Sequence, residues 1–193
     1  MKANKLIIAC AAAIVATGVT DKAYGMNDEQ QHGTSRTGAV SAVRHLRIKG
    51  GIYTGILNGK HEPHGLGIKV FRGGIQVGNF ANGKPNGKGM MMFSDGIIYV
   101  GDYVDGLPHG KGKVLFSNRN ALYAGDFVKG EWQGKGKLIN SDGIYEGDFV
   151  KGEKHGMGKL VSSNGFSYEG KFVHDIPEDY LSTFSALMGT LGL

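Results

Sequence analysis

The sequence has one cysteine and four prolines among its 193 residues. Cys10 lies inside the N-terminal apolar run, so removal of that run would leave no thiol, no disulfide and no sulfur ligand for a metal. That run, Leu6 to Val19, spans about 14 residues, fewer than the ~20 that a membrane-spanning helix needs. These shortages exclude a disulfide framework and a cysteine metal site from the processed chain.

The sequence also lacks a large excess of charge of either sign. The formal net charge is +5, and residues 26–193 hold 19 basic and 16 acidic side chains. So balanced a chain gives no reason to expect a nucleic-acid partner. A serine-histidine-aspartate arrangement, a phosphate-binding loop and a dinucleotide fingerprint are all missing from the sequence. We therefore expect no enzyme activity and no cofactor.

Residues 1–25 have the layout of a secretory signal peptide, because two lysines precede the apolar run and a polar stretch follows it. We expect cleavage after Gly25, with Gly18 as the second site. An uncleaved hydrophobic anchor or a buried strand is the alternative. Lipid attachment at Cys10 is not expected, because the apolar run continues past the cysteine.

Glycine is abundant, with 34 residues, and this abundance requires an explanation. Glycine does not recur at every third position, which excludes collagen, and interleaved aromatic residues argue against simple disorder. A short motif with glycine at its third position recurs every 22 to 24 residues. It starts at Tyr53, Gln76, Tyr99, Tyr123, Tyr145 and Tyr168.

This periodicity divides the chain into four parts. Residues 1–25 are the signal peptide, 26–44 a flexible linker, 45–174 the repeat array and 175–193 an amphipathic helix. The array consists of a half repeat at 45–52, full repeats at 53–75, 76–98, 99–122, 123–144 and 145–167, and a partial repeat at 168–174.

Each repeat alternates with period two, which is typical of strands. In Tyr99–Val104 the aromatic residues and the glycine share one face. Residues 105–108 predict a turn, and Gly112–Phe116 returns as a second strand. Each repeat is therefore predicted to be a β-hairpin whose strand glycines leave bare backbone on which an aromatic ring lies flat. One hairpin cannot bury that face, so several must stack side by side.

The pattern Tyr-x-Gly-(x)4-Gly-x-x-His-Gly-x-Gly, seen from Tyr99 to Gly112, resembles the MORN (membrane occupation and recognition nexus) repeat over about two thirds of the chain. The resemblance implies an elongated, twisted antiparallel sheet of consecutive hairpins, with roles in scaffolding, dimerisation or attachment next to a membrane. The sequence departs from the pattern at Gln76, Asn86 and Gln133, and by two extra residues between Gly59 and His64. The first two repeats are therefore expected to be less regular.

We thus predict an all-β fold, an elongated single-layer antiparallel sheet of consecutive hairpins with a C-terminal capping helix. The positions expected to build it are aromatic residues, glycines and two histidines. They are Tyr99, Gly101, Tyr103, His109, Gly110, Gly112, Tyr123, Gly125, Phe127, Gly134, Gly136, Tyr145, Gly147, Phe149, His155, Gly156 and Gly158.

His64, His109 and His155 occupy the same position in three repeats, and such a column suggests a metal site. The other two full repeats place Asn86 and Gln133 there, which are poor zinc ligands but keep a neutral hydrogen-bonding end. A hydrogen bond that fixes a turn explains all five residues, so no metal site is predicted.

Asp102, Asp126 and Asp148 form an acidic column. Strands ~4.8 Å apart place such residues ~10 Å from each other, which approaches the separation of paired glycosidase carboxylates. The facing strands carry lysines, so pairing of opposite charges across strands accounts for the aspartates without catalysis. In addition, no unique residue interrupts the repetition as an active site would. These lysines are Lys111, Lys113, Lys135, Lys137 and Lys159.

Together with Lys88 these lysines form a ladder. It is either a solvated charged face or a contact for anionic phospholipid headgroups, to which each lysine near the surface contributes ~1 kcal/mol. Trp132 replaces the prolines found at Pro85 and Pro108. It is either an anchor for a protein partner or packed against the neighbouring turn.

Residues 175–193 differ in character from the repeats. Pro177 and the two acidic residues after it suit a helix start. Apolar residues then recur at helical spacing, at Tyr180, Phe184, Leu187, Met188 and Leu191. Repeat arrays need covered ends, so we expect a helix that caps the last hairpin. A dimerisation helix or a membrane-contacting helix is the alternative.

The sequence therefore predicts an exported, non-catalytic scaffold in the periplasm, on the cell surface or in the medium, with an unidentified protein partner. The main alternative is a peripheral module that binds anionic phospholipid, and a homodimer could form through the repeat end or the C-terminal helix. An accessory or regulatory subunit of a separate enzyme is less favoured. Residues 26–44 and 175–193 are themselves too few to form a catalytic domain.

Overall fold

The computed structural model describes residues 43–191, which fall into two units that divide after Lys84. Unit 1 contains β1 (Arg44–Ile48), β2 (Gly51–Leu57), β3 (Pro63–Phe71) and β4 (Gly74–Ala81). These strands pair antiparallel in chain order. The predicted signal peptide, with Cys10, and nearly all of the predicted linker lie outside the described residues.

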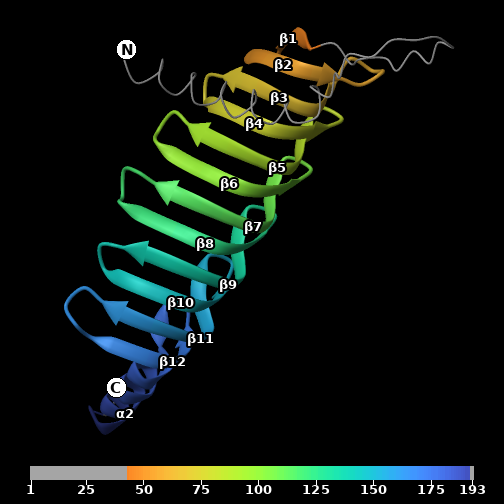
Figure 1. The fold of residues 1–193 in the computed structure, drawn as a ribbon. Helices are drawn as coiled ribbons and strands as arrows, with labels where there is room; N and C mark the ends of the chain where they lie inside the picture. Colours follow the sequence, from red (N-terminus) through yellow and green to blue (C-terminus); the bar gives the residue numbers. More distant parts are fainter. Residues whose placement is uncertain (1–42, 192–193) are drawn as a thin grey trace, which may run out of the picture. The chain divides into compact units, whose positions relative to one another are not determined.

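Unit 2 contains nine strands, the first of which begins at the boundary between the units. They are β5 (Lys84–Phe93), β6 (Ile97–Val104), β7 (Leu107–Phe116), β8 (Ala121–Val128), β9 (Glu131–Asn140), β10 (Gly143–Val150), β11 (Glu153–Ser162), β12 (Ser167–Val173) and β13 (Ile176–Pro177). Each pairs antiparallel with its neighbours in the sequence, so the hairpins of the unit follow one another side by side (Figure 1). The helix α2 (Glu178–Leu191) follows β13. The prediction of an all-β fold of consecutive hairpins with one C-terminal helix is confirmed.

Two-residue turns close the hairpins β6–β7, β8–β9 and β10–β11 of unit 2. Asp105 and Gly106, between β6 and β7, have φ angles of 50° and 90°. Positive φ at both central residues is typical of the type I′ turn, whose twist matches that of the flanking strands. Leu107 and Pro108 therefore belong to β7, opposite Val104 and Tyr103. The prediction that the turn extends to residue 108 was wrong, because a tight turn lets pairing begin at once.

A bulge follows each of these turns. Between the pairs Tyr103–Pro108 and Gly101–Gly112, β7 has three residues where β6 has one. Gly110 adopts a φ of 69° inside this bulge, a left-handed conformation that glycine favours. A Cβ at Gly110 would face the Asp102 side chain and not an aromatic ring. Gly110, and Gly134 and Gly156 likewise, are thus required by backbone conformation, whereas the sequence had suggested ring packing.

Strand glycines lie opposite one another in successive strands of unit 2, and we call these rows the glycine columns: Gly101, Gly112, Gly125, Gly136, Gly147 and Gly158. Aromatic rings cover one side of the sheet over these glycines, and we call that side the aromatic face. The Tyr99 ring lies over Gly101 and Gly112, and its hydroxyl donates to the carbonyl oxygen of Asp102 at 2.8 Å. It meets the rings of Tyr103 and Phe127 edge to face, with centroids 5.1 Å away in both pairs. Repetition of this contact buries a row of side chains in unit 2, namely Tyr99, Tyr103, Tyr123, Phe127, Tyr145, Phe149 and Phe172.

Burial also changes the pKa of these tyrosines. Together with the negative charge of the aspartate three residues later, it raises the pKa of Tyr99, Tyr123 and Tyr145 to about 12. The hydroxyls therefore remain protonated at neutral pH. They act as donors to backbone carbonyls at 2.8, 3.0 and 2.9 Å, respectively.

Successive hairpins are also joined through their turns. The N–H of Gly106 donates to the carbonyl oxygen of Pro85, and the N–H of Gly130 to that of Pro108, both at 2.8 Å. Equivalent bonds join Gly152 to Trp132 and, in unit 1, Gly83 to Pro63. Each tight turn is thus hydrogen-bonded to the second strand of the preceding hairpin.

The irregular spacing predicted for the first repeat has a local cause in unit 1. Five residues connect β2 and β3, whereas two residues connect β6 to β7, β8 to β9 and β10 to β11. The Asn58 side-chain oxygen accepts hydrogen bonds from the N–H groups of Lys60 and Glu62, both at 2.9 Å. The asparagine therefore orders the longer connection by satisfying its backbone donors.

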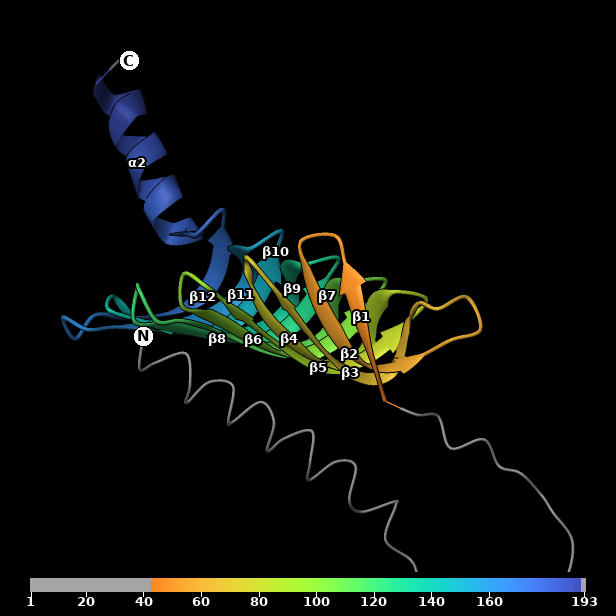
Figure 2. The same ribbon diagram turned by 90° about the horizontal axis from the view of Figure 1, so that it is seen from above.

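The helix α2 leaves the sheet of unit 2 next to β12 (Figure 2). Its first turn is held by an ion pair between Glu178 and Lys171 at 2.7 Å and by contact of the Tyr180 ring with Phe166. Leu187, farther along, is 58% exposed. The predicted helix is present, and the contacts described between its side chains and the last strands lie in its first turn, at Glu178 and Tyr180. Among the described residues, no helix is long and apolar enough to cross a membrane.

Candidate interaction surface

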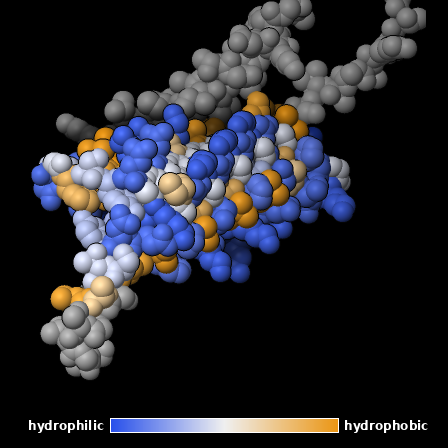
Figure 3. Space-filling view, turned by 90° about the horizontal axis from the view of Figure 1, so that it is seen from below, coloured by the Kyte–Doolittle hydropathy of each residue, from blue (hydrophilic) through white to orange (hydrophobic). Residues whose placement is uncertain are grey.

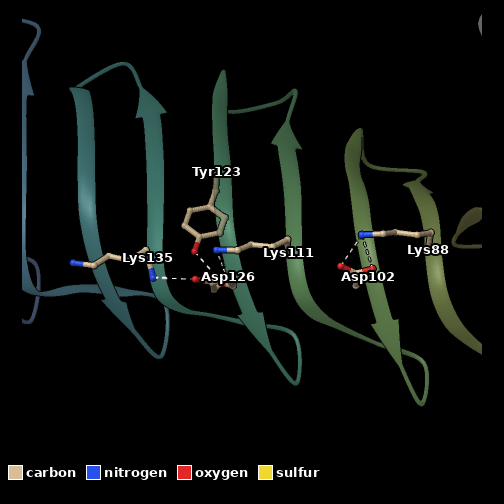
Figure 4. A network of polar contacts seen from close by, with 6 residues as sticks. All are labelled: Lys88, Asp102, Lys111, Tyr123, Asp126 and Lys135. Carbon is tan, nitrogen blue, oxygen red and sulfur yellow. Dashed lines mark hydrogen bonds and ion pairs between the residues drawn. The ribbon is translucent and has the colours of Figure 1, made fainter.

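The side of the unit 2 sheet opposite the aromatic face carries the predicted lysines, and we call it the charged face. Lysines and aspartates lie directly opposite each other on adjacent strands (Figure 4). Lys88 pairs with Asp102 at 2.7 Å, Lys111 with Asp126 at 2.6 Å and Lys135 with Asp148 at 2.8 Å. Of the lysines expected to pair with the aspartates, Lys111 and Lys135 do so. Lys137 and Lys159 pair with glutamates instead, because their strand positions face those residues.

The aspartates also hold the bulges. Asp126 accepts a hydrogen bond from the Lys135 N–H at 3.2 Å through its second oxygen, and Asp148 accepts one from the Met157 N–H at 3.1 Å. Each carboxylate thus joins a lysine on one neighbouring strand to a backbone donor on the other. This double use gives the aspartates a structural role.

A second row of ion pairs, not foreseen as pairs, involves glutamates. Lys137 pairs with Glu146 and Lys159 with Glu169, both at 3.1 Å. Lys113 lies in the same row, opposite Val100 and Ala124. The sequence signal that could have revealed these pairs is the position of each glutamate one residue after the repeat tyrosine.

An apolar row runs beside the charged ones, and the sequence interpretation missed it. It consists of residues that face one another across successive strands: Met92, Ile98, Leu115, Leu122, Ile139, Ile144 and Val161. Leu115, Ile139, Ile144 and Val161 are 38–43% exposed. Figure 3 shows such an alternation, with lines of apolar side chains between hydrophilic bands. The apolar row therefore places four exposed apolar side chains in line on the charged face.

The charged face is hollowed where the glycine columns pass beneath it. One open hollow of about 590 Å³ is lined by Ala124, by the glycine pairs Gly125–Gly136 and Gly147–Gly158 and by lysines on either side. A second, of about 500 Å³, lies against Ile144 and Val161. Both hollows border Lys137, Glu146 and Lys159, so apolar and charged groups line one continuous surface.

Residues of the histidine column differ from repeat to repeat in the contacts that they make. Gln133 accepts a hydrogen bond from the N–H of Lys151, in the next tight turn, at 3.1 Å. This is the turn-fixing bond predicted for the column, and it is present at this one position of the described chain. His155 instead packs against His174, whose ring nitrogen pairs with Glu153 at 2.6 Å. Within residues 43–191, no three metal-ligating side chains are grouped to hold an ion.

Trp132 lies on the aromatic face and not at an exposed tip. Its ring stacks on Tyr123 with centroids 4.2 Å apart and nearly parallel planes, and it meets Phe149 edge to face at 5.7 Å. Phe116 approaches from the preceding hairpin at 6.1 Å. Of the two roles considered for Trp132, these contacts support packing.

The MORN repeat family model matches residues 77–98, 99–121, 123–144 and 145–167. Four segments of the chain thus match the MORN repeat, and their limits agree with the predicted ones to within one residue. The predicted repeat at 53–75 lies outside the match, yet Tyr53 covers Gly55 and Gly67 there in the same way. Comparison with curated protein sequences finds no match for the chain.

Proposed function

We propose that this chain is an exported, non-catalytic MORN-repeat scaffold that binds a protein partner through the charged face of β7–β11. The exposed apolar row carries the proposal. Aligned apolar side chains flanked by charges of both signs offer a partner both apolar burial and polar contacts at the rim, as protein interfaces do. MORN repeats generally serve interaction with proteins or membranes, and the geometry of this face favours a protein.

The state of the lysines weakens the lipid alternative. Five of the six ladder lysines are ion-paired with carboxylates, Lys113 being the sixth. A lysine contributes ~1 kcal/mol near an anionic membrane surface, but an adjacent carboxylate is repelled by the same surface and offsets that gain. The ladder therefore offers little net attraction for anionic headgroups.

The interaction can be tested by placing a photo-crosslinking amino acid at Ile144, in the apolar row, within the producing cell. We expect a covalent adduct with another protein. The same amino acid at Lys129, in a tight turn at the edge of the sheet, is the matched control and should give little adduct. Equal labelling from both positions would contradict the proposed surface. Sedimentation of the chain with phosphatidylcholine vesicles that contain phosphatidylserine, but not with phosphatidylcholine alone, would favour the lipid alternative.

Export is a separate part of the proposal, supported by the two lysines and the apolar run of the leader. We expect the mature protein to begin near Met26, or near Val19 if the earlier site is used. Mass spectrometry of protein from fractionated cells measures this N-terminus directly. Recovery of an intact Met1 on cytosolic protein would contradict export.

A further inference from the structure

One lysine of the charged face, Lys113, has no ion-pair partner among the residues that the structure describes. In the later repeats the equivalent lysine faces a glutamate on the next strand. Lys137 of β9 lies opposite Glu146 of β10 and pairs with it at 3.1 Å, and the same arrangement recurs one repeat later. Lys113 of β7 lies instead opposite Ala124 of β8. The repeat that begins at Tyr123 thus lacks the glutamate that the next two place after their tyrosine.

The surroundings of Lys113 are largely apolar. On β6 it lies opposite Val100, which is 49% exposed. Leu115 of the apolar row follows two residues later on the same side of β7 and is 40% exposed. The aspartates of the two neighbouring strands are already paired with other lysines, namely Asp102 with Lys88 and Asp126 with Lys111. The sheet therefore gives Lys113 apolar neighbours but no carboxylate of its own.

A protein that covers the apolar row at β7 also covers Lys113. Two residues along a strand are ~6.8 Å apart at ~3.4 Å per residue, so a partner that buries Leu115 displaces water from the neighbouring ammonium group. Removing an ammonium group from water is costly unless an opposite charge and hydrogen-bond acceptors replace the water. A carboxylate on the partner meets that requirement.

The surface also has room for such a carboxylate. Ala124 lines the open hollow of about 590 Å³, and Glu146 lines the same hollow one repeat later. Since alanine carries only a methyl group where the later repeats carry a glutamate side chain, an incoming carboxylate can lie over Ala124 and take the place of that glutamate beside Lys113.

We propose that the protein partner of the charged face places an aspartate or glutamate side chain over Ala124, paired with Lys113, and apolar side chains against Val100 and Leu115. This inference rests on the proposed function of the charged face and specifies the chemistry of the segment that it binds. A basic or uncharged segment is disfavoured, because it would cover Lys113 without neutralising it. The other ladder lysines do not select the partner, since carboxylates of the sheet already pair with them.

Substitutions at Ala124 test the pairing in the producing cell, with the photo-crosslinking amino acid at Ile144. Ala124→Glu gives Lys113 the same partner within the sheet that its counterparts have. It should therefore repel the partner's carboxylate and lower the adduct yield at least about fivefold. Ala124→Gln, of nearly the same size but without charge, is the matched control and should lower the yield far less. Circular dichroism verifies the fold of both variants. Equal yields from the two would overturn the inference.

Peptide selection tests the chemistry of the bound segment. A random peptide library displayed on phage is selected on the purified full chain, and the enriched peptides are then measured against Ala124→Glu and Lys113→Met. We expect peptides that carry an aspartate or glutamate next to apolar residues, with affinity for both variants at least about fivefold lower. Enrichment of peptides without an acidic residue, or no enrichment at all, would overturn the inference.

The outcomes of crosslinking separate this inference from the function on which it rests. If the adduct from Ile144 forms and neither Ala124→Glu nor Lys113→Met lowers its yield, the inference fails while the proposed function stands. If Ile144 gives no protein adduct, both fail. Sedimentation with vesicles that contain phosphatidylserine, lost in Lys113→Met and without a protein adduct, would assign Lys113 to phospholipid and overturn the inference.

Discussion

Valine in place of Gly112 is expected to destabilise unit 2 by about 3 kcal/mol, at the upper end of the range for overpacking. A Cβ at Gly112 would lie 2.6 Å from the Tyr99 hydroxyl oxygen and 2.7–2.8 Å from two ring carbons. The ring cannot withdraw without breaking its hydrogen bond to Asp102 and its contact with Phe127. Equilibrium urea unfolding followed by the fluorescence of the single tryptophan, Trp132, measures the loss.

The sign of this effect is informative because strand propensity acts in the opposite direction. Valine is a better strand former than glycine, so in an ordinary strand the change would be neutral or stabilising. Gly136→Val, where the same contact involves Tyr123, should behave like Gly112→Val. Gly59→Val is the control, because no atom lies within 4 Å of a Cβ there. A neutral or stabilising valine at Gly112 would show that the ring does not lie on the glycine column.

Alanine in place of Tyr123 is expected to cost about 3–5 kcal/mol, the usual range for loss of a buried aromatic ring. Tyr123 is fully buried, stacks on Trp132 and meets Phe127 and Phe149 edge to face at 5.3 and 5.1 Å. Removal of the ring therefore opens a cavity shared by two successive hairpins. Because the change alters the surroundings of Trp132, unfolding is best followed by circular dichroism.

Two matched variants separate the parts of this effect. Tyr123→Phe removes only the hydrogen bond to the Asp126 carbonyl oxygen and should cost about 1 kcal/mol. Tyr180→Ala, at a half-exposed position in α2, should change stability by less than about 0.5 kcal/mol. If Tyr123→Ala costs no more than Tyr123→Phe, the aromatic face does not supply the main packing energy of unit 2.

The features that the sequence predicts correctly are local and repeated. The alternation in Tyr99–Val104 defines a strand, and recurrence every 22 to 24 residues shows that the same hairpin is built several times. The Lys–Asp pairs follow from the same periodicity, because equal spacing brings equivalent residues opposite each other. Both inferences need only the order of residues within one repeat and the spacing between repeats.

The features that it misses depend on register between strands. The bulge at Gly110 shifts β7 against β6, and nothing in the two segments taken separately specifies that shift. The apolar row has the same origin, because Leu115 and Leu122 become neighbours only once β7 and β8 are aligned. The direction of α2 depends on the contacts of its first turn, which helical periodicity alone cannot give.

The bonds between tight turns and preceding hairpins have a consequence for how such a chain can diversify. The acceptor in each bond is a backbone carbonyl, and the residues that provide it are as different as Pro85, Pro108 and Trp132. Replacement of the side chain therefore leaves the bond between hairpins in place. A duplicated hairpin would bring its own donor and acceptor, so the number of repeats and the chemistry of this column can change independently during evolution.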